Sequence, residues 1–237
     1  MTIDVERIVR SVDHTLLRTD ATIDEIKKLC DEAVKYQTAS VCIPPAYADE
    51  AVAYLAKKAE EAADAGDEKR AKPVPVCVVI GFPNGYSTAA SKAFETRDAI
   101  ERGVSEIDTV INVGFVKNGR YDAILEELRQ IREAAGDHVM KVIIETCLLT
   151  QEEKIRMCDI VTRSGADFIK TSTGFSKYGA TPEDVKLLAE HVGPGVKVKA
   201  AGGIHTLEEA QNYLDLGASR LGTSSIIKLL EEKKEAE

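Results

Sequence analysis

Residues 168–200, FIKTSTGFSKYGATPEDVKLLAEHVGPGVKVKA, predict a strand, a helix and a second strand in succession. The runs Phe168–Thr171 and Val196–Ala200 are short and largely apolar, as strands of a buried sheet are. Between them Thr181–Pro182–Glu183 is typical of a helix start. Apolar residues then recur at helical spacing: Val185, Leu188, Ala189 and Val192.

The same alternation extends over the rest of the chain. Further strands are expected at Val12–Leu17, Ala39–Ile43, Val74–Ile80, Glu106–Asn112, Val139–Thr146 and Arg220–Gly222. Capping boxes are expected at Thr150 and Thr206, and helix-ending glycines at Gly103, Gly165 and Gly217. Eight strand–helix units in 237 residues favour an α/β fold of one domain, residues 1–237, closed as a TIM (β/α)8 barrel with a short N-terminal helix.

Composition argues against several classes of protein. The net charge of −9 argues against a nucleic-acid-binding protein, and the mixed charges of Glu231–Glu235 indicate a solvated helical end. No apolar run reaches the length of a signal peptide or a membrane span, so we expect a cytoplasmic protein without membrane contact. The five cysteines form no CxxC motif and the four histidines are scattered, which predicts reduced thiols and no metal site.

Three polar side chains are expected inside the barrel near its catalytic end. Successive side chains of a strand point to opposite faces. Ile107, Ile169 and Val198 suit the helix-facing side. Their neighbours then point inward: Asp108, Lys170 and Lys199. Lys197 shares the face of Lys199, but it lies near the start of its strand, where a snorkelling or ion-paired lysine is expected.

Two lysines and an aspartate in one cavity have a chemical use. A second ammonium and partial desolvation lower the pKa of a lysine, whose free amine can then attack a carbonyl and form a Schiff base. The iminium is an electron sink, so a neighbouring C–C bond can break, and an aspartate in reach can transfer protons. The alternative is that Asp108 only neutralises one lysine, although two cations against one acid leave an excess positive charge.

Small residues follow the last three strands. Gly174, Gly202–Gly203 and Gly222–Ser225 come at strand ends, where a TIM barrel often binds phosphate with backbone amides and a helix N-terminus. Each alone is explained by an ordinary turn or helix cap. Their occurrence on neighbouring loops favours a phosphate site.

These segments together resemble a known family. VDHTLL, VCIPP, VVIGFP, EIDTVIN, FIKTSTGF, VKAAGGI and RLGTSS look like 2-deoxyribose-5-phosphate aldolase, a class I aldolase on a TIM barrel, over roughly Val12–Ser225. The resemblance implies reversible cleavage of 2-deoxy-D-ribose 5-phosphate to D-glyceraldehyde 3-phosphate and acetaldehyde in deoxyribose phosphate catabolism. It implies a covalent Schiff base and no metal or other cofactor.

The resemblance also implies roles for individual residues. Lys170 matches the Schiff-base lysine, Lys199 the lysine that perturbs it and Asp108 the proton-relay acid. The phosphate pocket matches Gly174, Gly202, Gly203, Ser224 and Ser225, and pocket-lining positions match Thr173, Asp13, Thr15 and Cys42. Two departures are Phe175, where some members have lysine, and the tyrosine-free end EEKKEAE. Phosphate recognition is therefore expected to depend more on the backbone and Ser224–Ser225.

Several alternatives remain open at this point. The chain could be a transaldolase-like enzyme acting on another phosphosugar, or a non-catalytic phosphosugar-binding barrel in which Lys170 and Lys199 only bind the anion. Cys42 is either a reactive thiol or, as we favour, a buried structural one. Glu145 either positions Lys170 or caps a hydroxyl. A homo-oligomer, dimer or tetramer, is expected.

Overall fold

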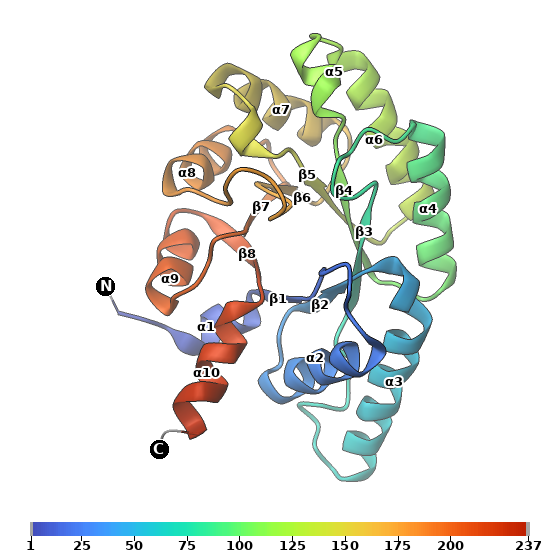
Figure 1. Cartoon of the computed structure of the whole chain (residues 1–237), viewed down its shortest axis with the longest axis vertical. Coiled ribbons are helices and arrows are strands. Elements are labelled where there is room, and N and C mark those ends of the chain that lie inside the picture. The colour runs from blue at the N-terminus through green and yellow to red at the C-terminus, as the bar shows by residue number, and fades with distance from the viewer. Residues whose placement is uncertain (1, 236–237) are drawn as a thin grey trace.

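The strands close into a barrel. The computed structural model describes residues 2–235, and in it each of eight parallel strands pairs with the next, while β8 returns to β1 (Figure 1). The strands are β1 (Val12–Thr15), β2 (Ser40–Ile43), β3 (Val76–Ile80), β4 (Glu106–Val110), β5 (Val139–Ile143), β6 (Phe168–Lys170), β7 (Lys197–Ala201) and β8 (Ala218–Thr223). The predicted (β/α)8 fold is confirmed.

Helices surround the strands and fill the crossovers between them (Figure 1). They are α1 (Val5–Arg10), α2 (Ile23–Tyr36), α3 (Ala48–Asp64), α4 (Ala89–Glu101), α5 (Val113–Lys117), α6 (Tyr121–Ala135), α7 (Gln151–Arg163), α8 (Pro182–His191), α9 (Leu207–Asp215) and α10 (Ser225–Glu235), with short 3-10 helices at Pro45–Tyr47 and Thr146–Leu148. Helix α1 is the predicted N-terminal helix, and its Arg7 pairs with Asp215 of α9. Within residues 2–235 no helix combines the length and apolarity needed to cross a membrane.

The main core lies between the strands and the helices. One set of alternating strand residues packs outward against the helices, including Val12, Val41, Val78, Ile107, Val142, Ile169, Val198 and Leu221. A much smaller apolar cluster, Cys42, Cys77 and Val79, lies on the inner face with Leu17 and Phe82. The rest of the barrel interior is therefore available for polar side chains.

Local hydrogen bonds explain where the elements begin and end. The capping boxes at Thr150 and Thr206 are confirmed, and a third, unpredicted one occurs at Thr22. Several strands are shorter than predicted, and the reason is identifiable for β4 and β5. The Asn112 side chain caps α5, which ends β4 at Val110, and Glu145 adopts a left-handed φ of 54° that turns the chain out of β5.

A buried ion pair joins α4 to α6 behind the end of β4. The Lys92 ammonium lies 2.7 Å from Glu127 Oε1 and donates at 2.7 Å to the carbonyl of Val110, the last residue of β4. Both charged side chains are buried. Burial lowers the pKa of Lys92 and raises that of Glu127, because it disfavours the charged form of each.

Removing one partner of this pair should destabilise the fold. Glu127→Ala leaves an uncompensated buried ammonium, so we expect the free energy of unfolding to fall by about 3–5 kcal/mol. The double variant Lys92→Met/Glu127→Leu replaces both charges with apolar groups and should lose much less. Urea unfolding of the three proteins measures this. Equal losses in the single and double variants would contradict it.

Candidate active site

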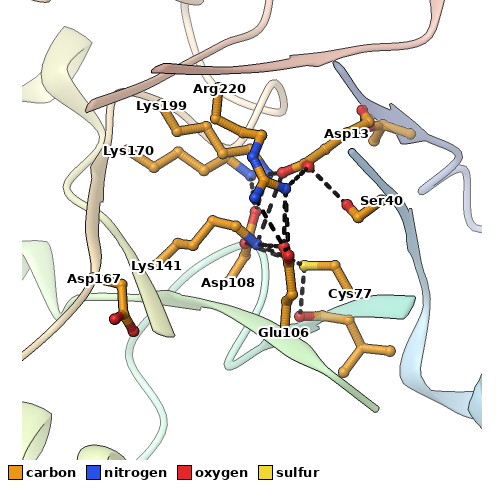
Figure 2. A network of polar contacts seen from close by, with 12 residues as sticks. Asp13, Ser40, Cys77, Glu106, Asp108, Lys141, Asp167, Lys170, Lys199 and Arg220 are labelled. Atoms are coloured by element: carbon orange, nitrogen blue, oxygen red, sulfur yellow. Dashed lines mark hydrogen bonds and ion pairs between the residues drawn. The ribbon is translucent and has the colours of Figure 1, made fainter. Parts of the chain in front are cut away.

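Three lysines from consecutive strands converge on the carboxylate of Asp108 (Figure 2). Lys170 Nζ, at the end of β6, lies 2.7 Å from Asp108 Oδ2. Lys199 Nζ, on β7, lies 2.6 Å from the same oxygen. Lys141 Nζ, on β5, lies 2.9 Å from Oδ1. The predicted meeting of Asp108, Lys170 and Lys199 inside the barrel is thus observed.

Two further acids and an arginine complete this charged cluster. Asp13 Oδ2 lies 2.5 Å from Lys199 Nζ, and Asp13 Oδ1 lies 2.5 Å from Arg220 Nη1. Glu106 Oε2 lies 2.6 Å from Lys141 Nζ and 3.1 Å from Arg220 Nη1. In Figure 2 the three lysines enter the cluster from one side, while Asp13 enters it from the opposite side. The predicted set of two lysines and one aspartate is therefore incomplete.

Strand alternation, which predicted Asp108, Lys170 and Lys199, also predicts two of the additional members. Lys141 lies in Val139–Ile143 and Glu106 lies two residues before Asp108, so alternation places both on the inner face. Arg220 is different. It reaches Asp13 because β8 pairs with β1 in the closed barrel, a contact that only tertiary structure creates.

The cluster fixes the charge of its central acid and of Lys199. Burial alone would raise the pKa of Asp108, but the ammonium groups of Lys141, Lys170 and Lys199 outweigh it and hold that pKa well below its usual range. Burial alone would lower the pKa of Lys199, but Asp108 and Asp13 outweigh it and raise that pKa above its usual value. Asp108 is thus a carboxylate and Lys199 an ammonium at neutral pH.

A cavity of about 370 Å³ opens above the cluster. Its lining includes Lys170 and most of the predicted substrate residues: Thr15, Thr173, Gly174, Gly202, Gly203, Ser224 and Ser225. The volume is that of a small-molecule site. Asp13, Cys42, Asp108 and Lys199 are not among the lining residues and are fully buried. Lys170 is therefore the member of the charged cluster that borders the cavity.

Four positions of the cavity lining require glycine, three because of the backbone conformation and one because Lys199 lies close by. Gly174, Gly202 and Gly203 have φ of 85°, 80° and 72°, which other residues rarely adopt. A Cβ on Gly222 would lie 3.2 Å from Cε of Lys199. These glycines shape the backbone around the predicted phosphate pocket.

Glu145 orients the segment that follows Lys170. Its carboxylate accepts hydrogen bonds from the hydroxyl of Thr173 at 2.5 Å and from the amide of Thr173 at 3.2 Å. Of the two open alternatives, capping a hydroxyl is the one observed. Because Thr173 gives its only hydroxyl proton to Glu145, its oxygen serves as an acceptor, here from the Phe175 amide at 3.1 Å.

Phe175 places an aromatic ring at the cavity wall. The ring packs edge-on against Phe82, with 5.3 Å between ring centroids and an interplanar angle of 84°. This corner of the cavity therefore carries no charge. Outside the cluster, Lys197 is exposed and lies over the ring of Phe168 at 5.7 Å, in keeping with a snorkelling lysine at the strand start.

The thiols of Cys42 and Cys77 lie beside Asp108. Together they are the group in residues 2–235 that has the side-chain spacing of a metal site, with ligand atoms within 4.8 Å of one another. The donor set is poorly suited to a cation, because the Asp108 oxygens already accept from three ammonium groups. Cys42 pairs with Cys77 across β2 and β3 and is fully buried, as expected for a structural thiol.

Comparison with known proteins identifies the family. The model of the DeoC/LacD family of aldolases matches residues 7–226. A deoxyribose-phosphate aldolase from Streptococcus agalactiae serotype Ia is 54% identical over 231 residues, which cover 98% of this chain and 97% of that protein. One from Streptococcus pyogenes serotype M28 is 54% identical over 230 residues, covering 97% and 96%.

A solved structure agrees with these sequence relatives. The tetrameric deoxyribose phosphate aldolase from Aeropyrum pernix superposes with a TM-score of 0.80 at 32% identity, covering 99% of this chain and 94% of that one. The fold and the relatives define an aldolase, a lyase built on a TIM barrel. The chain belongs to the DeoC/LacD family, and the membership predicted from its motifs is confirmed.

The charged cluster predicts a dependence of stability on acid pH. The pKa of Asp13 and that of Asp108 lie below their unfolded values near 3.9, so the unfolded chain takes up protons first as pH falls. Their contribution is present above about pH 4 and should be lost progressively below it. Asp108→Asn should lower stability at pH 7 by about 3–5 kcal/mol and flatten this acid dependence.

Urea unfolding between pH 7 and pH 3 measures both effects. Asp159→Asn is a matched control, because Asp159 is half-exposed and paired only with Arg163 in the described part of the chain. It should leave the stability curve nearly unchanged. An equally steep acid dependence in Asp108→Asn and in the unmodified protein would contradict the assignment.

Proposed function

We propose that this chain is a deoxyribose-phosphate aldolase that cleaves 2-deoxy-D-ribose 5-phosphate through a Schiff base on Lys170. The observation that supports this most directly is the position of Lys170. Its amine borders the cavity and at the same time lies 2.7 Å from Asp108, which is also bound by Lys199. A nucleophile, a fixed cation and an acid are thus in contact at the mouth of the barrel.

The geometry distinguishes the nucleophile from its neighbour. Lys170 and Lys199 share one oxygen of Asp108, so two ammonium groups there repel each other. Lys199 is also held by Asp13 and is closed off from the cavity. Because Lys170 borders the cavity and Lys199 does not, Lys170 is the amine that attacks the substrate aldehyde, while Lys199 stays charged.

The remaining steps break one C–C bond. The Lys170 amine adds to C1 of the open-chain sugar, and loss of water gives an iminium. A base removes the proton of the C3 hydroxyl, the C2–C3 bond breaks, and its electron pair forms the enamine. D-glyceraldehyde 3-phosphate leaves. Protonation of C2 and hydrolysis release acetaldehyde and restore the amine. Asp108, in contact with Nζ, relays the protons.

The other wall of the cavity suits the phosphate group. Gly174, Gly202, Gly203, Ser224 and Ser225 line the cavity that Lys170 borders, and α10 begins at Ser225. Backbone amides and a helix N-terminus favour an anion. A phosphate held by these residues orients the aldehyde end of the substrate toward the Lys170 amine.

The proposal includes the cofactor requirement, the cellular location and the partners of the enzyme. Because the iminium is itself the electron sink, the mechanism uses no metal ion or other cofactor. We expect the enzyme to act in the cytoplasm in deoxyribose phosphate catabolism, as a homo-oligomer, without nucleic acid or membrane partners. A transaldolase-like activity or simple phosphosugar binding remain the alternatives that the following experiments test.

Trapping the covalent intermediate tests the role of Lys170. Borohydride reduction in the presence of acetaldehyde should add one two-carbon group to Lys170, located by peptide mass spectrometry. Lys170→Ala should abolish cleavage of 2-deoxyribose 5-phosphate and the adduct while keeping its melting temperature close to that of the parent. The activity should persist in EDTA.

Lys197→Ala is the matched control, because Lys197 is an exposed lysine on the neighbouring strand. It should retain both activity and the adduct on Lys170. No adduct on an active enzyme would refute the mechanism, and loss of activity in EDTA would refute its metal independence.

Replacing the fixed cation should change the pH dependence of the rate. Lys199→Met removes the ammonium that shares Asp108 Oδ2 with Lys170, so protonation of Lys170 is less opposed and the reactive amine becomes scarcer at neutral pH. The rate at pH 7 should fall by about tenfold for each unit by which the profile moves, and activity should partly recover at alkaline pH. A uniform loss of kcat with an unchanged pH–rate profile would indicate a structural role only.

A further inference from the structure

Arg18 lies on the rim of the cavity and has no role in the mechanism above. It belongs to the segment between β1 and α2, which faces the glycine loops across the cavity. We propose that Arg18 binds the phosphate group of the substrate and so sets the preference for phosphorylated sugars. This inference rests on the proposed function and adds to it the residue that supplies positive charge to the phosphate.

The charged side chains that line the cavity are basic. None of the residues that line it is acidic, although the chain as a whole has a net charge of −9. Among these lining residues the lysine and arginine side chains are Lys170 and Arg18. Lys170 is used as the nucleophile, so Arg18 remains as the permanent cation for a dianionic group.

Arg18 is also positioned in the lining that contains the predicted phosphate pocket. Arg18 and Ser224 line both this cavity and an adjoining groove of about 690 Å³. Together they form the rim between the two. Ser224 immediately precedes α10, whose N-terminus contributes to the phosphate pocket. Arg18 thus lines the same cavity as Ser224, Ser225 and the glycine loops, so its guanidinium is available to an anion bound there.

The segment that carries Arg18 is fixed at both ends. The Leu16 amide donates to the Cys42 carbonyl at 3.0 Å, which continues the pairing of β1 with β2. The Tyr47 hydroxyl donates to the Ala21 carbonyl at 2.6 Å, and Thr22 begins α2 with its capping box. Arg18 is therefore presented from a short, anchored segment, so little ordering is needed to bind a ligand.

The present partners of Arg18 leave it able to bind an anion. Its Nη1 donates to Asp20 at 2.8 Å and its Nη2 to Glu25, and all three side chains are substantially exposed. Exposed ion pairs of this kind contribute little to stability, so exchanging one costs little. A guanidinium has five N–H donors, and these two bonds use only two of them.

Steady-state kinetics of Arg18→Met tests the inference. Loss of a charge-assisted contact should raise KM for 2-deoxyribose 5-phosphate about tenfold to a hundredfold, with kcat nearly unchanged. Cleavage of unphosphorylated 2-deoxyribose should keep its kcat/KM, and inorganic phosphate should become a weaker competitive inhibitor of it. Arg18→Lys should restore part of the lost affinity.

Asp20→Asn is the matched control, because it removes one of the two ion pairs of Arg18 and leaves Arg18 in place. If Arg18 binds phosphate, this variant should keep or lower KM for the phosphorylated substrate. If Arg18 only pins the segment, Arg18→Met should affect both sugars equally, and removal of the Asp20 pair should raise KM for both. Either result would overturn the inference.

The failure of this inference differs from failure of the proposed function. An unmodified protein that cleaves 2-deoxyribose 5-phosphate, with an Arg18→Met variant of unchanged KM, refutes only the role of Arg18. An unmodified protein without that activity refutes the proposed function. In that case titration of both proteins with inorganic phosphate decides the anion site, and equal affinities would refute it.

Discussion

The Asp108 carboxylate is the interaction on which the interior of this barrel depends. Three lysines from β5, β6 and β7 place their ammonium groups within 2.6–2.9 Å of its two oxygens. Each of these groups would be very costly to bury alone. With Asp13, Glu106 and Arg220 the cluster holds four basic and three acidic side chains. It is one acid short, and it becomes neutral when a single lysine loses its proton.

This imbalance gives the barrel a chemical function in addition to its stability. The core between strands and helices is apolar and requires no charges. The inner face instead holds buried ions, and removing one of its acids leaves further uncompensated positive charge. Arg220, Lys141 and Lys199 each contact two or more acids, whereas Lys170 contacts Asp108 alone.

Local patterns in the sequence were sufficient for the fold and for part of the site. Alternation within strands placed Asp108, Lys170 and Lys199 on one inner face, and the same rule applies to Glu106 and Lys141. Other contacts depend on closure of the barrel, as when β8 brings Arg220 to Asp13. The environment of Arg18 depends on the path of a loop between anchored ends, which no short-range pattern encodes.

Depth along the barrel axis separates two residues with the same chemistry. Lys170 and Lys199 are register partners on β6 and β7 and bind the same oxygen of Asp108. Lys170 ends its strand and borders the cavity, whereas Lys199 is followed by two more residues of β7 and is fully buried. Contact with Asp13 then keeps Lys199 charged. The position of the strand end, rather than the type of side chain, therefore decides which lysine borders the cavity.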